Sequence, residues 1–160
     1  MRRVITVGIA VLTASFVLFP PAAHAKTRDP CKLLKRAQIA KVFGQKAGPP
    51  DTGEPPPLFE QCYWNLEATD GQPAASIGTT VQTLAAKSTF EVNRESQFAQ
   101  DVPSIKDAYY DSDLRSLNVL RGDVLLGVQL IYFDGEDVSG TPPEPELVRL
   151  TKAALKRLRQ

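Results

Sequence analysis

Side chains that commonly carry out nucleophilic, acid–base or metal chemistry are scarce in this chain of 160 residues. The only histidine is His24, and the only two cysteines are Cys31 and Cys62. His24 lies in an N-terminal segment with the pattern of a removable leader, so the mature chain would contain no histidine. This composition excludes Ser-His-Asp and Cys-His catalysis, and two cysteines without histidine cannot form the usual zinc sites. We therefore expect neither a metal nor a cofactor.

The cysteine pair is best explained as a disulfide. The export signal would place both residues in an oxidising compartment, where paired cysteines persist as disulfides. A bond between Cys31 and Cys62 would close a loop spanning 31 positions, worth about 3–4 kcal/mol in the chain-entropy description. A redox or metal-binding pair would need a low-pKa thiolate in a short motif such as Cys-x-x-Cys, and the spacing here is far longer. We predict a structural disulfide.

Carboxylates are the remaining candidates for chemistry. Asp111 with Asp113, and the acidic residues of 134–137, could begin calcium loops, but neither stretch has the glycine and the bidentate glutamate of an EF-hand. An irregular calcium site at 134–137 remains an alternative. A carboxylate pair could also hydrolyse a glycosidic bond, which depends on the separation of the two groups in space. Because the chain has no G-x-S-x-G elbow and no glycine-rich phosphate loop, we do not expect an enzyme.

Residues 1–25 have the three-part layout of a secretory signal peptide. Arg2 and Arg3 supply the positive charge, residues 4–19 the apolar run, and Ala23-His24-Ala25 the cleavage site. Retention as a membrane anchor is the alternative, because a run of about 16 residues is only slightly shorter than the roughly 20 needed to span a bilayer. Cleavage after Ala25 would leave residues 26–160 as a single secreted domain, located outside the cytoplasm in the cell envelope.

The mature chain is almost electrically neutral. Without Arg2 and Arg3 it has 17 basic and 18 acidic residues, a net charge of −1. Nucleic-acid-binding domains have a concentrated basic footprint, so nucleic acid is not the expected partner. The whole chain has 42% hydrophobic and 23% charged residues, as an ordinary globular protein does. Beyond the leader, no stretch is long and apolar enough to span a membrane.

Hydrophobic periodicity predicts three helices and five strands in the mature chain. The expected elements are a helix from Pro30 to Phe43, a proline-rich loop 45–58, strands 59–67 and 75–83, a helix 84–100, strands 108–111, 114–120 and 124–133, and a C-terminal helix between Glu144 and Arg159. Tight turns at Ser112-Asp113 and Gly122-Asp123 can join only antiparallel neighbours. We therefore predict an α+β fold, an antiparallel sheet of about five strands with helices packed on one side and one disulfide.

A few aromatic and proline residues could form an interaction surface. Trp64 shares its strand face with Cys62 and is expected in the core, whereas Tyr63 points the other way. Tyr109 and Tyr110 are neighbours in a predicted strand, so one of them should face outward. The candidate interaction residues are Tyr63, Tyr109, Tyr110 and, in the proline-rich loop, Pro55, Pro56 and Pro57.

Two charged patterns have both a structural and a functional interpretation. Arg121-Gly122-Asp123 matches the integrin-binding tripeptide, but its place between two predicted strands favours a tight turn with glycine at positive φ. The last helix has a basic outer face, which could contact anionic lipid or a cell-wall polymer, or could simply be solvated. That face comprises Arg149, Lys152, Lys156 and Arg157.

Several motifs occur together in an order that resembles a known family. They are Asp29-Pro30-Cys31-x-Leu33-Leu34, the stretch from Ile39 to Gly44, Cys62-x-Trp64, Ala108-Tyr109-Tyr110 and Leu120-x-Gly122-Asp123-Val124. In these motifs the mature chain resembles the exported actinobacterial envelope proteins grouped as domain of unknown function 3558. The resemblance implies a small extracytoplasmic domain with one disulfide, often tethered as a lipoprotein, and it assigns no catalytic residue. This chain differs in having no lipobox cysteine, and in Lys35, where the family usually has a Ser or Thr that caps a second helical segment.

These observations together favour a secreted, non-catalytic binding or sensor-like module of the cell envelope that recognises an unknown ligand or protein. An accessory or structural subunit of an envelope complex is the main alternative, and an exposed apolar patch would favour it. A carboxylate-based hydrolase of envelope polymers is a further alternative. A cleft with two facing carboxylates, one with a raised pKa, would favour that function.

Overall fold

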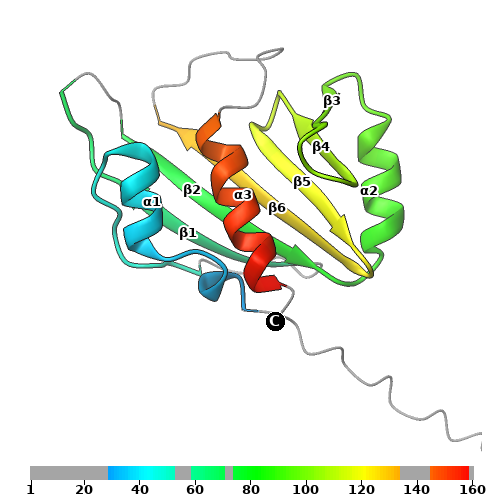
Figure 1. Ribbon diagram of the computed structural model, residues 1–160, viewed down its shortest axis with the longest axis horizontal. Coiled ribbons are helices and arrows are strands. Elements are labelled where there is room, and N and C mark those ends of the chain that lie inside the picture. The colour runs from blue at the N-terminus through cyan, green and yellow to red at the C-terminus, as the bar shows by residue number, and fades with distance from the viewer. Residues whose placement is uncertain (1–28, 53–58, 71–73, 134–144, 159–160) are drawn as a thin grey trace, which may run out of the picture.

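Six strands form one antiparallel sheet in the structure, a computed structural model that describes residues 29–52, 59–70, 74–133 and 145–158 (Figure 1). In spatial order the strands are β1 (Glu60–Leu66), β2 (Ala75–Gln82), β6 (Val124–Tyr132), β5 (Ser116–Arg121), β4 (Ala108–Asp111) and β3 (Ala99–Asp101). The helical elements are the 3-10 turn η1 (Pro30–Lys32) and the helices α1 (Arg36–Phe43), α2 (Ala86–Arg94) and α3 (Pro145–Leu158). The predicted α+β class and antiparallel sheet are confirmed, with six strands where about five were expected. None of the described helices is long and apolar enough to cross a membrane.

The larger core lies between one face of the sheet and a layer formed by η1, α1 and α3. Alternate residues of the central strands point into it, and Ile77, Val119 and Leu126 are fully buried there. The apolar stripe predicted for the last helix packs against them. Its members Leu147, Leu150, Ala154, Leu155 and Leu158 are all buried. Trp64 is 1% exposed in the same core, as its position on the strand predicted.

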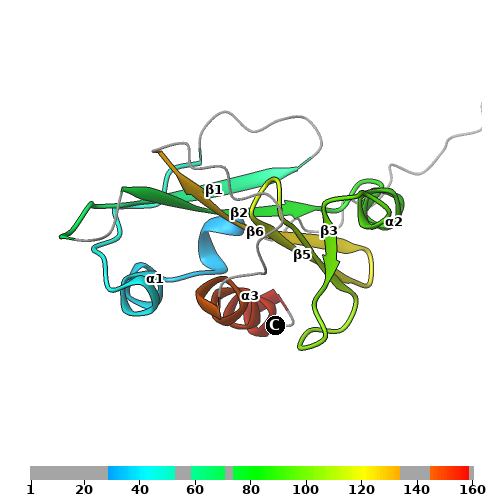
Figure 2. The same ribbon diagram turned by 90° about the horizontal axis from the view of Figure 1, so that it is seen from above.

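Helix α2 covers the opposite face of the sheet, so the prediction that the helices pack on one side is wrong for this helix (Figure 2). Phe90 of α2 packs against Tyr109 of β4, with ring centroids 5.4 Å apart, and against Leu125 of β6. These two strand residues alternate with neighbours that point into the larger core. The second face of β4 and β6 therefore carries its own apolar patch, which α2 and its Ala86 remove from water.

The first two predicted helices are longer than the helices in the structure. The helix predicted from Pro30 to Phe43 is interrupted at Lys35, whose extended backbone (φ −104°, ψ 140°) separates η1 from α1. Gly44 ends α1 in the left-handed conformation, as predicted (φ 71°). The helix predicted over 84–100 ends at Arg94, and residues 99–101 form β3 instead, because the edge of β4 offers a ladder of backbone partners.

The predicted disulfide is present and joins the start of the helical layer to β1. The Cys31 and Cys62 sulfur atoms are bonded, with Cα atoms 5.2 Å apart. The described part of the proline-rich loop then runs antiparallel to β1, and bridges from Ala47 to Leu66 and from Asp51 to Tyr63 cover part of its free edge. Pro55, Pro56 and Pro57 lie outside the described residues.

Candidate functional site

The candidate tyrosines occupy three different environments. Tyr63 is half-buried on the α2 side of the sheet, and its hydroxyl donates to Oε1 of Gln61 at 2.9 Å. Its ring lies over Gly78, where a Cβ atom would be only 2.8 Å from Cε1 of the ring. Tyr109 and Tyr110 are 2% and 1% exposed. The expectation that one of them faces outward is wrong, because α2 covers Tyr109 on one face of β4 and Tyr110 is part of the larger core on the other face.

The ionisation of Tyr109 is clearly shifted by its surroundings. Burial raises the pKa of its phenol above the ordinary value of 10.0, since the charged phenolate would lose its hydration. The Asn93 side chain opposes the rise by hydrogen bonding, and the negative charge of Asp111 adds a smaller increase in the pKa. The hydroxyl therefore stays protonated at neutral pH, and this residue serves the packing of α2.

A groove lies on the α2 side of the sheet, beside the Tyr63 and Gly78 pair. Its volume is about 210 Å³, the space of roughly seven water molecules. Eleven described residues line it, and all of them are uncharged: Phe59, Thr80, Gln82, Thr89, Asn93, Leu114, Ser116, Asn118, Leu125, Gly127 and Gln129. Phe59 and Leu125 make parts of the wall apolar, whereas seven of the other residues carry a hydroxyl or an amide.

The floor of the groove is one row of paired residues across three strands. Thr80 of β2 pairs with Gly127 of β6, which pairs with Asn118 of β5. A Cβ atom at position 127 would lie 2.4 Å from the Thr80 hydroxyl oxygen and 3.2 Å from Oδ1 of Asn118. Only glycine therefore lets these two polar atoms approach each other over the sheet, and the missing side chain leaves the floor open.

The amide side chains of the groove are fixed by their NH₂ groups. The Asn118 amide donates to Oγ of Ser116 at 2.8 Å, the Gln129 amide to the carbonyl of Leu114 at 2.9 Å, and the Gln82 amide to Oγ1 of Thr89 at 2.8 Å. Within the described part of the chain, no donor is paired with the amide oxygens of these three side chains. None of the three oxygens is a buried unpaired atom, so each reaches solvent. The groove thus presents oriented hydrogen-bond acceptors on a neutral surface.

Comparison with protein-family models, curated proteins and solved structures gave no match.

Carboxylates gather at a second, shallower hollow between α2 and the end of β5. This open depression of about 440 Å³ is lined by Phe90, Glu91, Arg94, Glu95, Asp107 and Leu120. Its acids are exposed and two of them face cations, Glu91 at 3.8 Å from Lys87 and Asp107 at 3.8 Å from Arg121. Such ion pairs are typical of a solvated surface.

The other charged candidates have local structural roles or lie outside the described residues. Oδ1 of Asp111 accepts the backbone N–H groups of Asp113 and Leu114 and so closes the turn after β4. Arg121 donates to the carbonyl of Lys106 at 2.8 Å, and Gly122 has φ 61°, so the Arg-Gly-Asp tripeptide forms a tight turn. The possible calcium ligands of 134–137 are not described. Among the residues that are described, no three His, Cys, Asp or Glu side chains come together as a metal site.

The groove itself was not predicted from the sequence, although a signal for it exists. In three strands, several of the alternate residues that point away from the larger core are small or polar. They are Ser76, Gly78 and Thr80 in β2, Ser116 and Asn118 in β5, and Gly127 and Gln129 in β6. Each set taken alone is typical of a solvated strand face. Only the pairing of β2 with β6 places the three sets side by side.

Proposed function

We propose that this protein is a secreted, non-catalytic binding module of the cell envelope and that its ligand occupies the groove on the α2 side of the sheet. The ligand is a neutral, hydroxyl-rich unit such as a sugar residue of an envelope polysaccharide. The observation that carries the proposal is the set of three amide oxygens, of Gln82, Asn118 and Gln129, held as acceptors by their own NH₂ hydrogen bonds.

The chemistry of the lining supports this ligand class. Hydroxyl groups donate to amide oxygens, and a neutral ligand is not penalised for lying against an uncharged wall. Phe59 and Leu125 provide apolar contact for the C–H faces that a sugar ring also presents. A groove of about 210 Å³ holds a single small unit and leaves the rest of a polymer outside.

The compartment is supported by separate observations. The disulfide between Cys31 and Cys62 is of the kind that persists outside the reducing cytosol. The leader pattern of residues 1–25 and the resemblance to exported envelope proteins favour the same location.

The proposal is tested by a thermal-shift and calorimetric screen of the oxidised chain from Lys26 to Gln160. All buried hydrophobic residues of the two described cores lie between Leu33 and Leu158, so this chain retains both cores. Neutral saccharides at a hundred times their dissociation constant should stabilise the chain by about 2.7 kcal/mol, a shift of several degrees. The ligand should be recovered chemically unchanged, because a hydrolase would convert it.

Two variants on α2 locate the binding site. Asn93→Trp places a large ring on the rim of the groove and should abolish the shift. Val92→Trp, one residue earlier, adds the same ring at a side chain that is 69% exposed and outside the groove, and should leave the shift intact. The proposal would be contradicted if both variants kept the saccharide-induced shift or both lost it, or if no saccharide stabilised the original chain.

An accessory subunit is the second candidate function, because several large apolar side chains are exposed. They are Leu84, Val92, Leu114 and Phe133, each at least 55% exposed among the described residues. In this alternative no saccharide raises the melting temperature, and crosslinking in the envelope recovers a protein partner. The partner should cover these apolar side chains and shield them from solvent.

A further inference from the structure

The layer formed by η1, α1 and α3 is strongly basic, although the protein as a whole is nearly neutral. Residues 29–44 and 145–158, which contain these elements, include eight basic and two acidic side chains. The basic ones are Lys32, Lys35, Arg36, Lys41, Arg149, Lys152, Lys156 and Arg157, and the acidic ones are Asp29 and Glu146. The remaining described residues carry an excess of acidic side chains, eleven against six. Among the described residues, positive charge is therefore concentrated on the side of the sheet that η1, α1 and α3 cover.

Half of these basic side chains are held by partners in the layer or in the segment that follows α1. Arg36 donates to the carbonyl of Ala47 at 2.9 Å, and Arg157 donates to the carbonyl of Leu33 at 2.7 Å. Lys32 pairs with Asp29 at 3.0 Å, and Arg149 pairs with Glu146.

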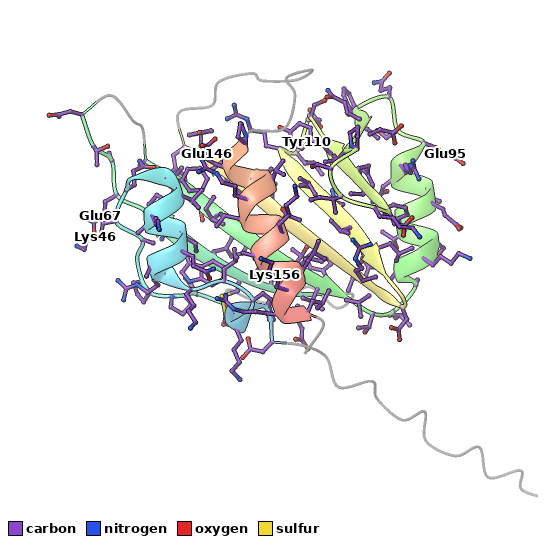
Figure 3. All side chains as sticks on the ribbon, viewed as in Figure 1. Lys46, Glu67, Glu95, Tyr110, Glu146 and Lys156 are labelled. Atoms are coloured by element: carbon purple, nitrogen blue, oxygen red, sulfur yellow. A yellow bond between two sulfur atoms is a disulfide. The ribbon has the colours of Figure 1, made fainter. Side chains whose placement is uncertain are left out.

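Four exposed lysines have no acidic partner among the described residues: Lys35, Lys41, Lys152 and Lys156. Lys152 and Lys156 are one turn apart on the outer side of α3, and Lys35 and Lys41 belong to the start and end of α1. Helices α1 and α3 lie on the same side of the sheet and contact each other (Figure 2), and we call the four exposed lysines of this side the lysine face. Figure 3 marks Lys156 on it.

Within the described ranges, charged residues of neighbouring elements do not cancel this charge. Beside α1, Lys46 pairs with Glu67 at 2.8 Å, which adds no net charge (Figure 3). Beside α3, the segment 102–107 packs into the same core through Val102 and Ile105 and carries Lys106 and Asp107, again one charge of each sign.

We propose that the lysine face docks on an anionic phospholipid surface. Four separate ammonium groups on flexible stems suit a diffuse layer of negative charge, and each basic residue near such a surface strengthens binding about fivefold. A discrete phosphate group is held differently, by converging arginine forks or backbone N–H groups, and the arginines of this layer are already engaged with Ala47, Glu146 and Leu33. Lipid is therefore favoured over a soluble anionic polymer.

The test measures binding of the chain from Lys26 to Gln160 to sedimented vesicles. One set of vesicles is phosphatidylcholine alone, and the other contains equal parts of phosphatidylglycerol and phosphatidylcholine. We expect binding to the anionic set only, weakening as salt is raised toward and beyond physiological strength. Lys152→Gln/Lys156→Gln removes two charges and should weaken this binding by up to about twenty-five-fold while retaining helix-forming side chains. The charge reversal Lys152→Glu/Lys156→Glu should weaken it further, by more than about twenty-five-fold.

The matched control is Lys87→Glu/Arg94→Glu on α2, which makes the same change in net charge on the opposite side of the sheet. It should leave vesicle binding within about twofold of the original chain, since these sites lie beyond the reach of a screened surface potential. Equal losses in both charge-reversed chains would show that overall charge and not the lysine face is responsible. Failure to bind anionic vesicles, or binding to soluble polyphosphate in their place, would also overturn the proposal. None of these substitutions touches the groove, so ligand binding there is tested separately.

Discussion

Removing the disulfide should cost this domain a large share of its stability. The double substitution Cys31→Ala/Cys62→Ala opens a loop of 31 positions, for which the chain-entropy relation gives about 3.7 kcal/mol at 25 °C. Domains of this size are stable by roughly 5–15 kcal/mol, so between a quarter and most of the total would be lost. With an unfolding entropy of about 0.28 kcal/mol per degree for some 135 residues, the melting temperature should fall by about 13 °C.

Urea unfolding followed by circular dichroism measures this loss directly. The original chain in reducing buffer is the matched control, because it loses the cross-link and keeps both sulfur atoms, and it should unfold at nearly the same urea concentration as the double alanine variant. The slope of the free energy with urea should rise in both, since an unfolded chain without the cross-link exposes more surface. A loss below about 1 kcal/mol, with the slope unchanged, would refute the loop-entropy reasoning.

Three further predictions concern the α2 side of the sheet. Because burial raises the pKa of Tyr109, the unfolded chain ionises first as pH rises, so stability should fall with pH from about 10 upward; urea unfolding across this range should show the fall, and Tyr109→Phe should flatten it. Gly127→Ala places a Cβ atom 2.4 Å from the Thr80 hydroxyl and should destabilise by about 1–3 kcal/mol. Adding Thr80→Ala should recover most of that loss in a double-mutant cycle, and no recovery would count against the proposed clash. Phe90→Ala should cost about 3 kcal/mol or more in urea, whereas Val92→Ala on the exposed side should change stability by less than about 0.5 kcal/mol; similar costs would contradict the packing of α2.

Local sequence patterns predicted correctly those elements that bury a single apolar side in the larger core. The alternation of Cys62, Trp64 and Leu66 predicted β1 and its buried face, and the leucine spacing from Leu147 to Leu158 predicted α3. In each case the chain alone shows which side chains avoid water. The oxidising compartment implied by the leader likewise predicted the cysteine pairing that the structure contains.

The errors arise where distant segments decide the outcome. Periodicity shows that α2 has an apolar side with Phe90, but not which face of the sheet it covers. Residues 99–101 become a strand only because β4 offers a free edge, which no local propensity records. The groove depends on Thr80, Gly127 and Asn118 being aligned across three strands, and this alignment exists only after β2 has paired with β6.

The position of β6 has a consequence for the order in which the chain can fold. This strand lies at the centre of the sheet between β2 and β5, yet it is the last of the described strands in the sequence. Its partner β2 pairs across a long interval, with Ala75 opposite Tyr132. The hairpin of β1 and β2 therefore waits for more than forty further residues before its second neighbour exists, and closing so long a loop makes folding slow. A growing chain cannot complete this sheet until Tyr132 has emerged, and its larger core closes only when α3 has also been made.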